Sequence, residues 1–100
     1  MIRMTMFASL LALPSSAQAV NRAEVTPAEL ARALIPVASI RAYHIDKTRI
    51  RPTDLRILRC VGPEEEPTEF ECTWLQRTKG GWVRHKTWLA IDGRGWHVID

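Results

Sequence analysis

Cys60 and Cys72 are the two cysteines of this 100-residue sequence, and their spacing limits the chemistry they can perform. Redox pairs are usually spaced C-x-x-C, and a zinc site needs about four ligands close together; neither pattern surrounds these residues. In an oxidising compartment such a pair forms a disulfide. We therefore expect a structural bond between Cys60 and Cys72. In the chain-entropy model it stabilises the domain by about 3 kcal/mol.

Trp82, Arg84, Lys86 and Trp88 occupy every second position of one apolar and basic stretch. Side chains two residues apart on a strand point to the same face of a sheet. Aromatic residues with Arg are typical of interface cores, so we expect these four residues to bind a partner. Two alternatives stay open. The Arg and Lys stems could simply lie over the Trp rings of a solvated face, or residues 37–50 could cover that face.

The other reactive side chains predict no catalytic, cofactor or metal site. His85 and His97 are expected on opposite faces of the sheet and so cannot share an ion, and His44 lies in a segment without a clear pattern. Glu64, Glu65 and Glu66 are flanked by prolines and are typical of a solvated loop. The sequence contains no G-x-S-x-G, H-E-x-x-H or phosphate-loop pattern. We therefore expect that the protein is not an enzyme.

Residues 1–19 have the pattern of a secretory signal peptide. Arg3 precedes a ten-residue apolar run, which ends before the small residues of an A-x-A site. That run is shorter than the roughly 20 residues that span a bilayer. We expect cleavage between Ala19 and Val20, with cleavage two residues earlier as the alternative, and an uncleaved anchor or a buried helix as rival readings. The sequence thus predicts a bacterial periplasmic or secreted protein with no transmembrane segment in the mature chain.

Length and charge narrow the function classes further. One hundred residues correspond to a single domain at most. After removal of Arg3 with the signal peptide, 13 basic residues face 11 acidic ones, a net charge of +2. A nucleic-acid module is usually more basic than this, and export removes most nucleic-acid partners. We expect an envelope protein or a second copy as the partner, with an anionic envelope glycan or lipid headgroup as a weaker fit.

The mature chain predicts one helix followed by strands. Thr26, Pro27 and Glu29 form a capping-box start for a helix over 27–35, whose apolar positions follow helical spacing. Residues 20–25 are expected to be a loose leader, and 37–53 has no clear pattern, although 40–45 could add a strand. Alternation and turn residues predict four strands, which cover 55–61, 68–78, 82–91 and 96–99.

The apolar pattern also predicts the strand registers. Cys60 should oppose Cys72, and a two-residue Gly80-Gly81 turn should pair Lys79 with Trp82. One face would then pack against the helix; it comprises Leu58, Cys60, Phe70, Cys72, Trp74, Val83, Leu89, Ile91, Trp96 and Val98. The opposite face would carry Leu55, Ile57, Arg59, Leu75, Arg77, Trp82, Arg84, Lys86, Trp88, His97 and Ile99.

These elements predict an α+β domain with one helix packed on a four-stranded antiparallel meander. In outline it is similar to cystatin-like and nuclear-transport-factor-like folds, a resemblance of architecture. The functional expectation is a small exported, disulfide-tied binding protein that uses its Trp- and Arg-bearing sheet face. The alternatives are an inhibitor of a secreted hydrolase, acting through the acidic 62–68 loop, and a carrier of a small apolar ligand.

Overall fold

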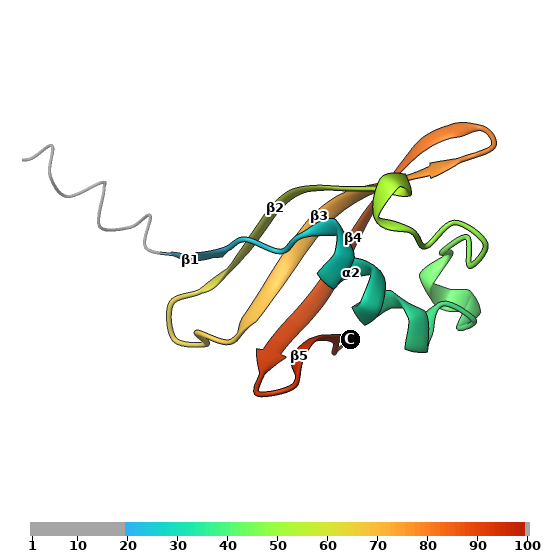
Figure 1. Ribbon diagram of the computed structural model, residues 1–100. Helices are drawn as coiled ribbons and strands as arrows, with labels where there is room; N and C mark the ends of the chain where they lie inside the picture. The colour runs from blue at the N-terminus through green and yellow to red at the C-terminus, as the bar shows by residue number, and fades with distance from the viewer. Residues whose placement is uncertain (1–19, 100) are drawn as a thin grey trace, which may run out of the picture.

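The computed structural model describes residues 20–99 as one helix and a five-stranded antiparallel sheet (Figure 1). The predicted signal peptide and its cleavage site at Ala19 lie outside the described residues. The strands follow one another in the sheet in sequence order. They are β1 (Val20–Ala23), β2 (Leu55–Pro63), β3 (Glu69–Thr78), β4 (Gly81–Asp92) and β5 (Gly95–Val98). The α+β class with an antiparallel meander is therefore confirmed.

The helix α2 (Pro27–Leu34) begins as its capping box predicts. The Thr26 hydroxyl oxygen accepts a hydrogen bond from the Glu29 backbone N–H at 3.1 Å, and the Glu29 carboxylate accepts one from the Thr26 N–H at 2.9 Å. Leu30 and Leu34 are fully buried. The helix ends just before Pro36, which cannot supply an N–H for another helical bond.

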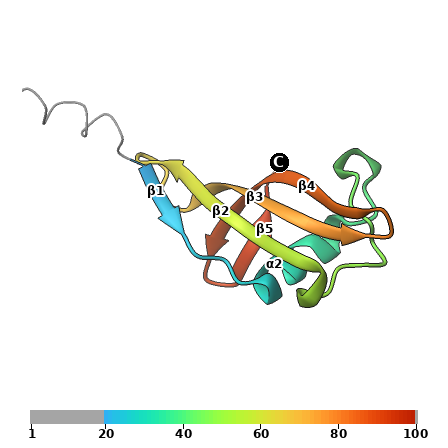
Figure 2. The ribbon, with the colours of Figure 1, turned by 90° about the horizontal axis from the view of Figure 1, so that it is seen from above.

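Among residues 20–99, the elements outside the sheet lie on one of its faces (Figure 2). The helix α2 packs there, and the segment that follows it lies on the same side, where Ile45 and Ile50 contact the core. This segment contains three short 3₁₀ helices: η2 (Ile35–Val37), η3 (Arg41–Tyr43) and η4 (Pro52–Asp54). The alternative in which residues 37–50 cover the opposite face is wrong. We call that opposite side of the sheet the outer face.

The prediction of four strands is wrong because residues 20–23 form a fifth strand rather than a loose leader. β1 pairs antiparallel with the end of β2, with Arg22 opposite Val61 and Ala23 opposite Cys60. The Asn21 side-chain amide also donates to the Pro63 carbonyl at 3.0 Å. This short polar strand is held mainly by backbone and amide hydrogen bonds, which need no apolar pattern.

A β-bulge at Leu58 changes the faces of β2. The pairing runs from Ile57 opposite Trp74 to Arg59 opposite Thr73, which leaves Leu58 unpaired and 48% exposed. The prediction that Leu58 lies on the face packed against the helix is therefore wrong. Leu55 and Ile57, predicted on the outer face, instead lie on the helix side. Arg56 takes a place on the outer face opposite Leu75.

The β3–β4 hairpin is offset by two residues from the predicted register. Thr78 pairs with Gly81, so that Lys79 and Gly80 form the turn and Arg77, rather than Lys79, lies opposite Trp82. Gly81 has a φ of +114°, which favours glycine. Because the offset is an even number, every side chain of β4 keeps its predicted face. In the last hairpin Leu89 lies opposite Val98 and Ile91 opposite Trp96, so Trp96 and Val98 lie on the predicted face.

The predicted disulfide is present between Cys60 and Cys72, which are directly opposed on β2 and β3. Their Cα atoms are 4.0 Å apart, the short separation of a non-hydrogen-bonded pair. Both residues are buried in the core beside Phe70, Trp74 and Leu89. None of the helices within residues 20–99 is both long and apolar enough to cross a membrane.

Replacing both cysteines by alanine should lower the free energy of unfolding by about 3 kcal/mol, because the unfolded chain regains the freedom of the 60–72 loop. Urea unfolding, followed by Trp fluorescence with and without reductant, measures this. The oxidised wild-type chain should lose a similar amount on reduction, whereas the alanine variant should be unaffected. Equal stability of the oxidised and reduced wild-type chains would contradict the assignment.

Candidate functional site

The four residues predicted to bind a partner lie together on the outer face of β4. Trp82, Arg84, Lys86 and Trp88 alternate with inward residues such as Thr87 and Leu89, which are buried in the core. Their neighbours across the sheet are Arg77, Leu75, Thr73 and Glu71, in that order. The sequence pattern therefore placed these four side chains on the correct face, although the offset of the register changed all four of their cross-strand neighbours.

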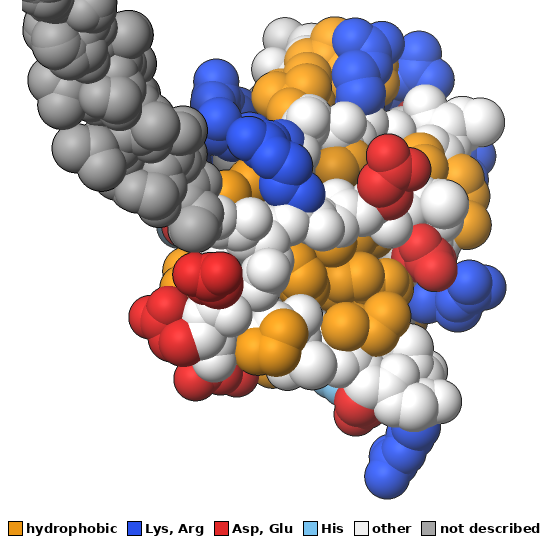
Figure 3. Space-filling view, turned by 90° about the vertical axis from the view of Figure 1, so that its left-hand side faces the viewer, with side chains coloured by type: hydrophobic (Ala, Val, Ile, Leu, Met, Phe, Trp, Pro, Cys, Tyr) orange, Lys and Arg blue, Asp and Glu red, His pale blue; other side chains and the backbone are white. Residues whose placement is uncertain are grey.

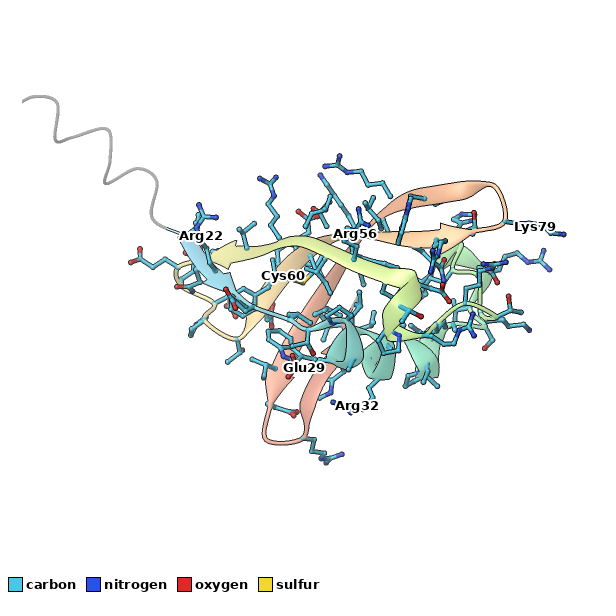
Figure 4. The ribbon with its side chains drawn as sticks, turned by 45° about the horizontal axis from the view of Figure 1, so that its top comes forward. Arg22, Glu29, Arg32, Arg56, Cys60 and Lys79 are labelled. Atoms are coloured by element: carbon cyan, nitrogen blue, oxygen red, sulfur yellow. A yellow bond between two sulfur atoms is a disulfide. The ribbon has the colours of Figure 1, made fainter. Side chains whose placement is uncertain are left out.

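Three further cations come from the neighbouring strands. Arg56 and Arg59 lie on β2, where they oppose Leu75 and Thr73, and Arg22 lies on β1 opposite Val61. Figure 4 shows Arg22 and Arg56 on the side of the sheet away from α2. Glu29 and Arg32, which belong to α2, lie on the other side. We define the basic face as the outer-face residues Arg22, Arg56, Arg59, Arg77, Trp82, Arg84, Lys86 and Trp88.

Arg56, which was not predicted as a site residue, lies against Trp82, the most exposed tryptophan of this face. Its guanidinium carbon lies 4.6 Å from the centroid of the Trp82 ring, and that of Arg77 lies 5.5 Å away. Cation–π contacts at exposed sites contribute about 0.5–1 kcal/mol each. Trp82 is still 41% exposed, so much of the ring remains available to a partner. A signal for Arg56 was present, because the apolar alternation of β2 changes phase between Ile57 and Cys60.

Arg77 is fixed at the end of the basic face by the buried carboxylate of Asp54. Its Nε donates to Asp54 Oδ1 at 3.2 Å, while Arg51 Nε donates to Oδ2 at 3.1 Å. Burial of the carboxyl group raises the pKa of Asp54, but the hydrogen bonds and charges of Arg51 and Arg77 outweigh it and leave that pKa below its usual value of 3.8. Arg77 also donates to the Thr53 carbonyl at 3.2 Å. The Trp82 ring therefore rests against an anchored guanidinium.

The other cations of the basic face lack carboxylate partners. Within residues 20–99, no carboxylate oxygen lies within 4.0 Å of the charged groups of Arg56, Arg59, Arg84 or Lys86. Thr73, between Arg59 and Lys86, is only 3% exposed although no other element of the described part of the chain covers this face. The aliphatic stems of its neighbours therefore shield it while their charged ends reach water. In Figure 3 basic side chains gather at the top of the molecule, apart from the acidic group at the lower left.

Three of the acidic residues lie in the loop between β2 and β3, while Glu69 and Glu71 of β3 lie opposite Ala90 and Trp88. Glu64, Glu65 and Glu66 are exposed. The loop is nevertheless ordered by two turns, since the Glu66 N–H donates to the Pro63 carbonyl and the Glu69 N–H donates to the Glu66 carbonyl. The β2–β3 disulfide lies at its base. These residues form no ion pair with the basic face among the described residues.

Gln76, for which the sequence predicted no role, positions the segment between α2 and β2. Its side chain is buried; its oxygen accepts from the Asp46 N–H at 3.0 Å, and its nitrogen donates to the carbonyls of Asp46 and Arg49. Two large grooves border this segment, beside a smaller one of about 370 Å³. One, of about 610 Å³, is lined by residues 38–41 and 44–48. The other, of about 500 Å³, lies between residues 42–44 and residues 83–87 of β4.

The histidines do not come together. His97 is on the outer face, where its Nε2 lies 3.0 Å from Asp92 Oδ2, and His85 is on the helix side, stacked on Trp74 with ring centroids 4.4 Å apart. His44 has a left-handed φ of 55° and borders the groove beside His85. Within residues 20–99, no group of three or more His, Cys, Asp or Glu side chains is arranged to hold a metal ion.

Comparison with models of known protein families, with curated protein sequences and with solved structures finds no match. The basic face must therefore be interpreted from its own geometry and charge.

Lowering the pH should destabilise the fold through His85. Burial lowers the pKa of His85 below 6.5, and the nearby His44 charge lowers it further. Below pH 6.5 the unfolded chain therefore binds a proton at this position that the folded chain binds less readily, and the free energy of unfolding falls. Urea unfolding between pH 7.5 and 5 should show a shallower pH dependence in His85→Phe than in the wild type. Identical slopes would contradict this assignment.

Proposed function

We propose that this chain is a small exported binding protein that docks an acidic partner protein on its basic face. The observation that carries the proposal is a group of cations without carboxylate partners beside a half-exposed Trp82, on the sheet face that no other element of residues 20–99 covers. A solvated antiparallel face is usually polar throughout, whereas aromatic residues with Arg are typical of the centres of interfaces. The proposal assigns the protein no catalytic step.

The charges of this face favour an anionic partner. Arg84 and Lys86 are two residues apart on one strand, so their Cα atoms are about 7 Å apart. In water two like charges at this distance repel by about 0.6 kcal/mol, a cost that a folded domain tolerates. Carboxylates of a partner replace this repulsion with attraction and accelerate encounter at low salt. Trp82, held by Arg56 and Arg77, supplies apolar contact area without further ordering.

Export is part of the proposal and has two supports. Residues 1–19 carry the signal-peptide pattern. The Cys60–Cys72 bond is of the kind that persists in oxidising compartments. Both point to the periplasm or the outside of the cell, where the partner must also be found.

Reversing two charges of the basic face should abolish partner capture without unfolding the domain. The double variant Arg84→Glu/Lys86→Glu is expected to weaken binding at least about tenfold, or 1.4 kcal/mol, because two attractions become repulsions. Co-purification from the native host, followed by affinity measurement on the identified partner at 50 and 300 mM salt, tests this. Arg32→Glu is the control, since it reverses one positive charge at an exposed position of α2, away from the basic face.

Retention of the partner by a folded Arg84→Glu/Lys86→Glu variant, or equal loss in the Arg32→Glu control, would contradict the proposal. Trp fluorescence and urea unfolding establish whether each variant is folded.

The second candidate function is inhibition of a secreted hydrolase by the 62–68 loop. Its support is the order of that loop, which has two turns above the β2–β3 disulfide and three exposed carboxylates at its tip. A protease and lysozyme panel tests it. Inhibition at micromolar concentration that is lost when Glu64, Glu65 and Glu66 are all changed to Gln would favour this candidate; no inhibition would exclude it for those enzymes. The apolar-carrier alternative has less support, because Leu30, Leu34 and Trp74 are fully buried where helix and sheet meet.

A further inference from the structure

Part of β4 is a free sheet edge that adjoins the basic face. β4 has 12 residues, but β5 pairs only with its last four, from Leu89 to Asp92. Figure 1 shows the β3–β4 hairpin extending well beyond β5. The stretch from Trp82 to Lys86 therefore has β3 on one side and no strand of the described chain on the other.

The backbone groups at this edge can be assigned from the ladder. The Ile91 N–H donates to the Thr68 carbonyl, which extends the register of β3 and β4 by one pair. In an antiparallel ladder hydrogen-bonded pairs alternate, so odd-numbered residues of β4 bond to β3 and even-numbered residues point to the other side. The bond from the Ile99 N–H to the Trp88 carbonyl agrees with this assignment. Trp82, Arg84 and Lys86 therefore direct their N–H and C=O groups out of the free edge.

We propose that this edge binds an extended acidic segment of the partner protein by strand addition. The inference rests on the proposed function and adds the binding mode and the chemistry of the ligand. Of the ligands considered, only a peptide backbone offers donors and acceptors that alternate at the spacing of Trp82, Arg84 and Lys86. A glycan or a lipid headgroup would leave these groups unmatched.

Side chains of an added strand would meet two different surfaces. Those on the outer side would lie beside Arg84 and Lys86, where opposite charges are favourable cross-strand neighbours. Those on the helix side would lie over the groove of about 500 Å³, beside Val83 and His85. Val83 is 43% exposed in this groove. The edge thus selects a strand in which acidic and apolar residues alternate.

The same charges disfavour a second copy at this edge. Symmetric antiparallel pairing centred on Arg84, His85 or Lys86 would set Arg84 against Arg84, Arg84 against Lys86, or Lys86 against Lys86, respectively. Like charges directly opposite each other destabilise a sheet. Basic side chains on an edge strand also guard against self-association.

The direct test uses a peptide of stated sequence, Val-Glu-Val-Glu-Val-Glu-Val with both ends blocked, and the ¹⁵N-labelled chain as it is purified from its host. We expect binding that slows hydrogen exchange of the Arg84 and Lys86 backbone amides at least tenfold. Two peptides are compared, one N-methylated at its odd-numbered residues and the other at its even-numbered residues. One of them should lose binding and the other should bind nearly as well as the unmodified peptide, because only one of the two sets of N–H groups points to β4.

A pair of protein variants separates backbone from side chain. Lys86→Ala removes the charge alone, whereas Lys86→Pro also removes the outward N–H; proline is tolerated at such edge positions. The proline variant should bind the peptide at least tenfold more weakly than the alanine variant. If Lys86→Pro does not fold, the N-methylated peptides give the same information on the unmodified protein.

Other outcomes would overturn the inference. Peptide binding with unchanged exchange at Arg84 and Lys86 and equal affinity for the two Lys86 variants would exclude strand addition but leave the basic face as the docking site. A concentration-dependent dimer that protects these amides without peptide would assign the edge to a second copy. Partner capture that survives both the charge reversal of Arg84 and Lys86 and the proline substitution would overturn the proposed function as well.

Discussion

The constraint on which the rest of the structure depends is that a short domain can cover only one face of its sheet. The helix α2 has eight residues, and it shares the same face with the segment from η2 to η4. The side chains of the described strands that point to the outer face must therefore be compatible with contact with water. Long basic side chains meet that requirement, because their stems shield residues such as Thr73 while their charges stay solvated. The basic face is thus a consequence of the one-sided layering as well as a surface that suits an acidic partner.

Two local features convert this general constraint into a specific site. The bulge at Leu58 moves Leu55 and Ile57 into the core and directs Arg56 outward, where it lies over the Trp82 ring. The buried carboxylate of Asp54 then holds Arg77 near the same ring. These contacts fix the orientation of an exposed aromatic side chain before any partner arrives, which lowers the ordering cost of binding.

Features with a strong local signal could be predicted from the sequence, whereas features held by polar or backbone bonds could not. The capping box of Thr26 and Glu29 and the pairing of Cys60 with Cys72 were predicted correctly. β1 was missed because a four-residue polar strand bound by backbone hydrogen bonds has no apolar alternation. The path from η2 to η4 was missed because Gln76 anchors it by hydrogen bonds to Asp46 and Arg49, which produce no periodic pattern.

The candidate site shows the same division. Alternation placed Trp82, Arg84, Lys86 and Trp88 on the correct face, and the two-residue offset of the hairpin left that result intact because faces repeat every second residue. For the same reason the apolar pattern could not distinguish the two registers. On β2 the bulge at Leu58 exchanges the faces of residues 55–57 relative to a regular strand. Arg56 was therefore not predicted on the outer face. The free edge of β4 depends on the length of β5 relative to β4, which is a property of the whole sheet.

Site-specific photo-crosslinking tests most directly whether the basic face is the binding surface. A photoreactive residue at position 86 in the chain produced by its native host would be compared with the same residue at position 32 on α2. The account predicts an adduct from position 86 alone, with the crosslinked peptide of the partner rich in Asp and Glu. Adducts of equal yield from both positions, or a partner peptide without acidic residues, would contradict it.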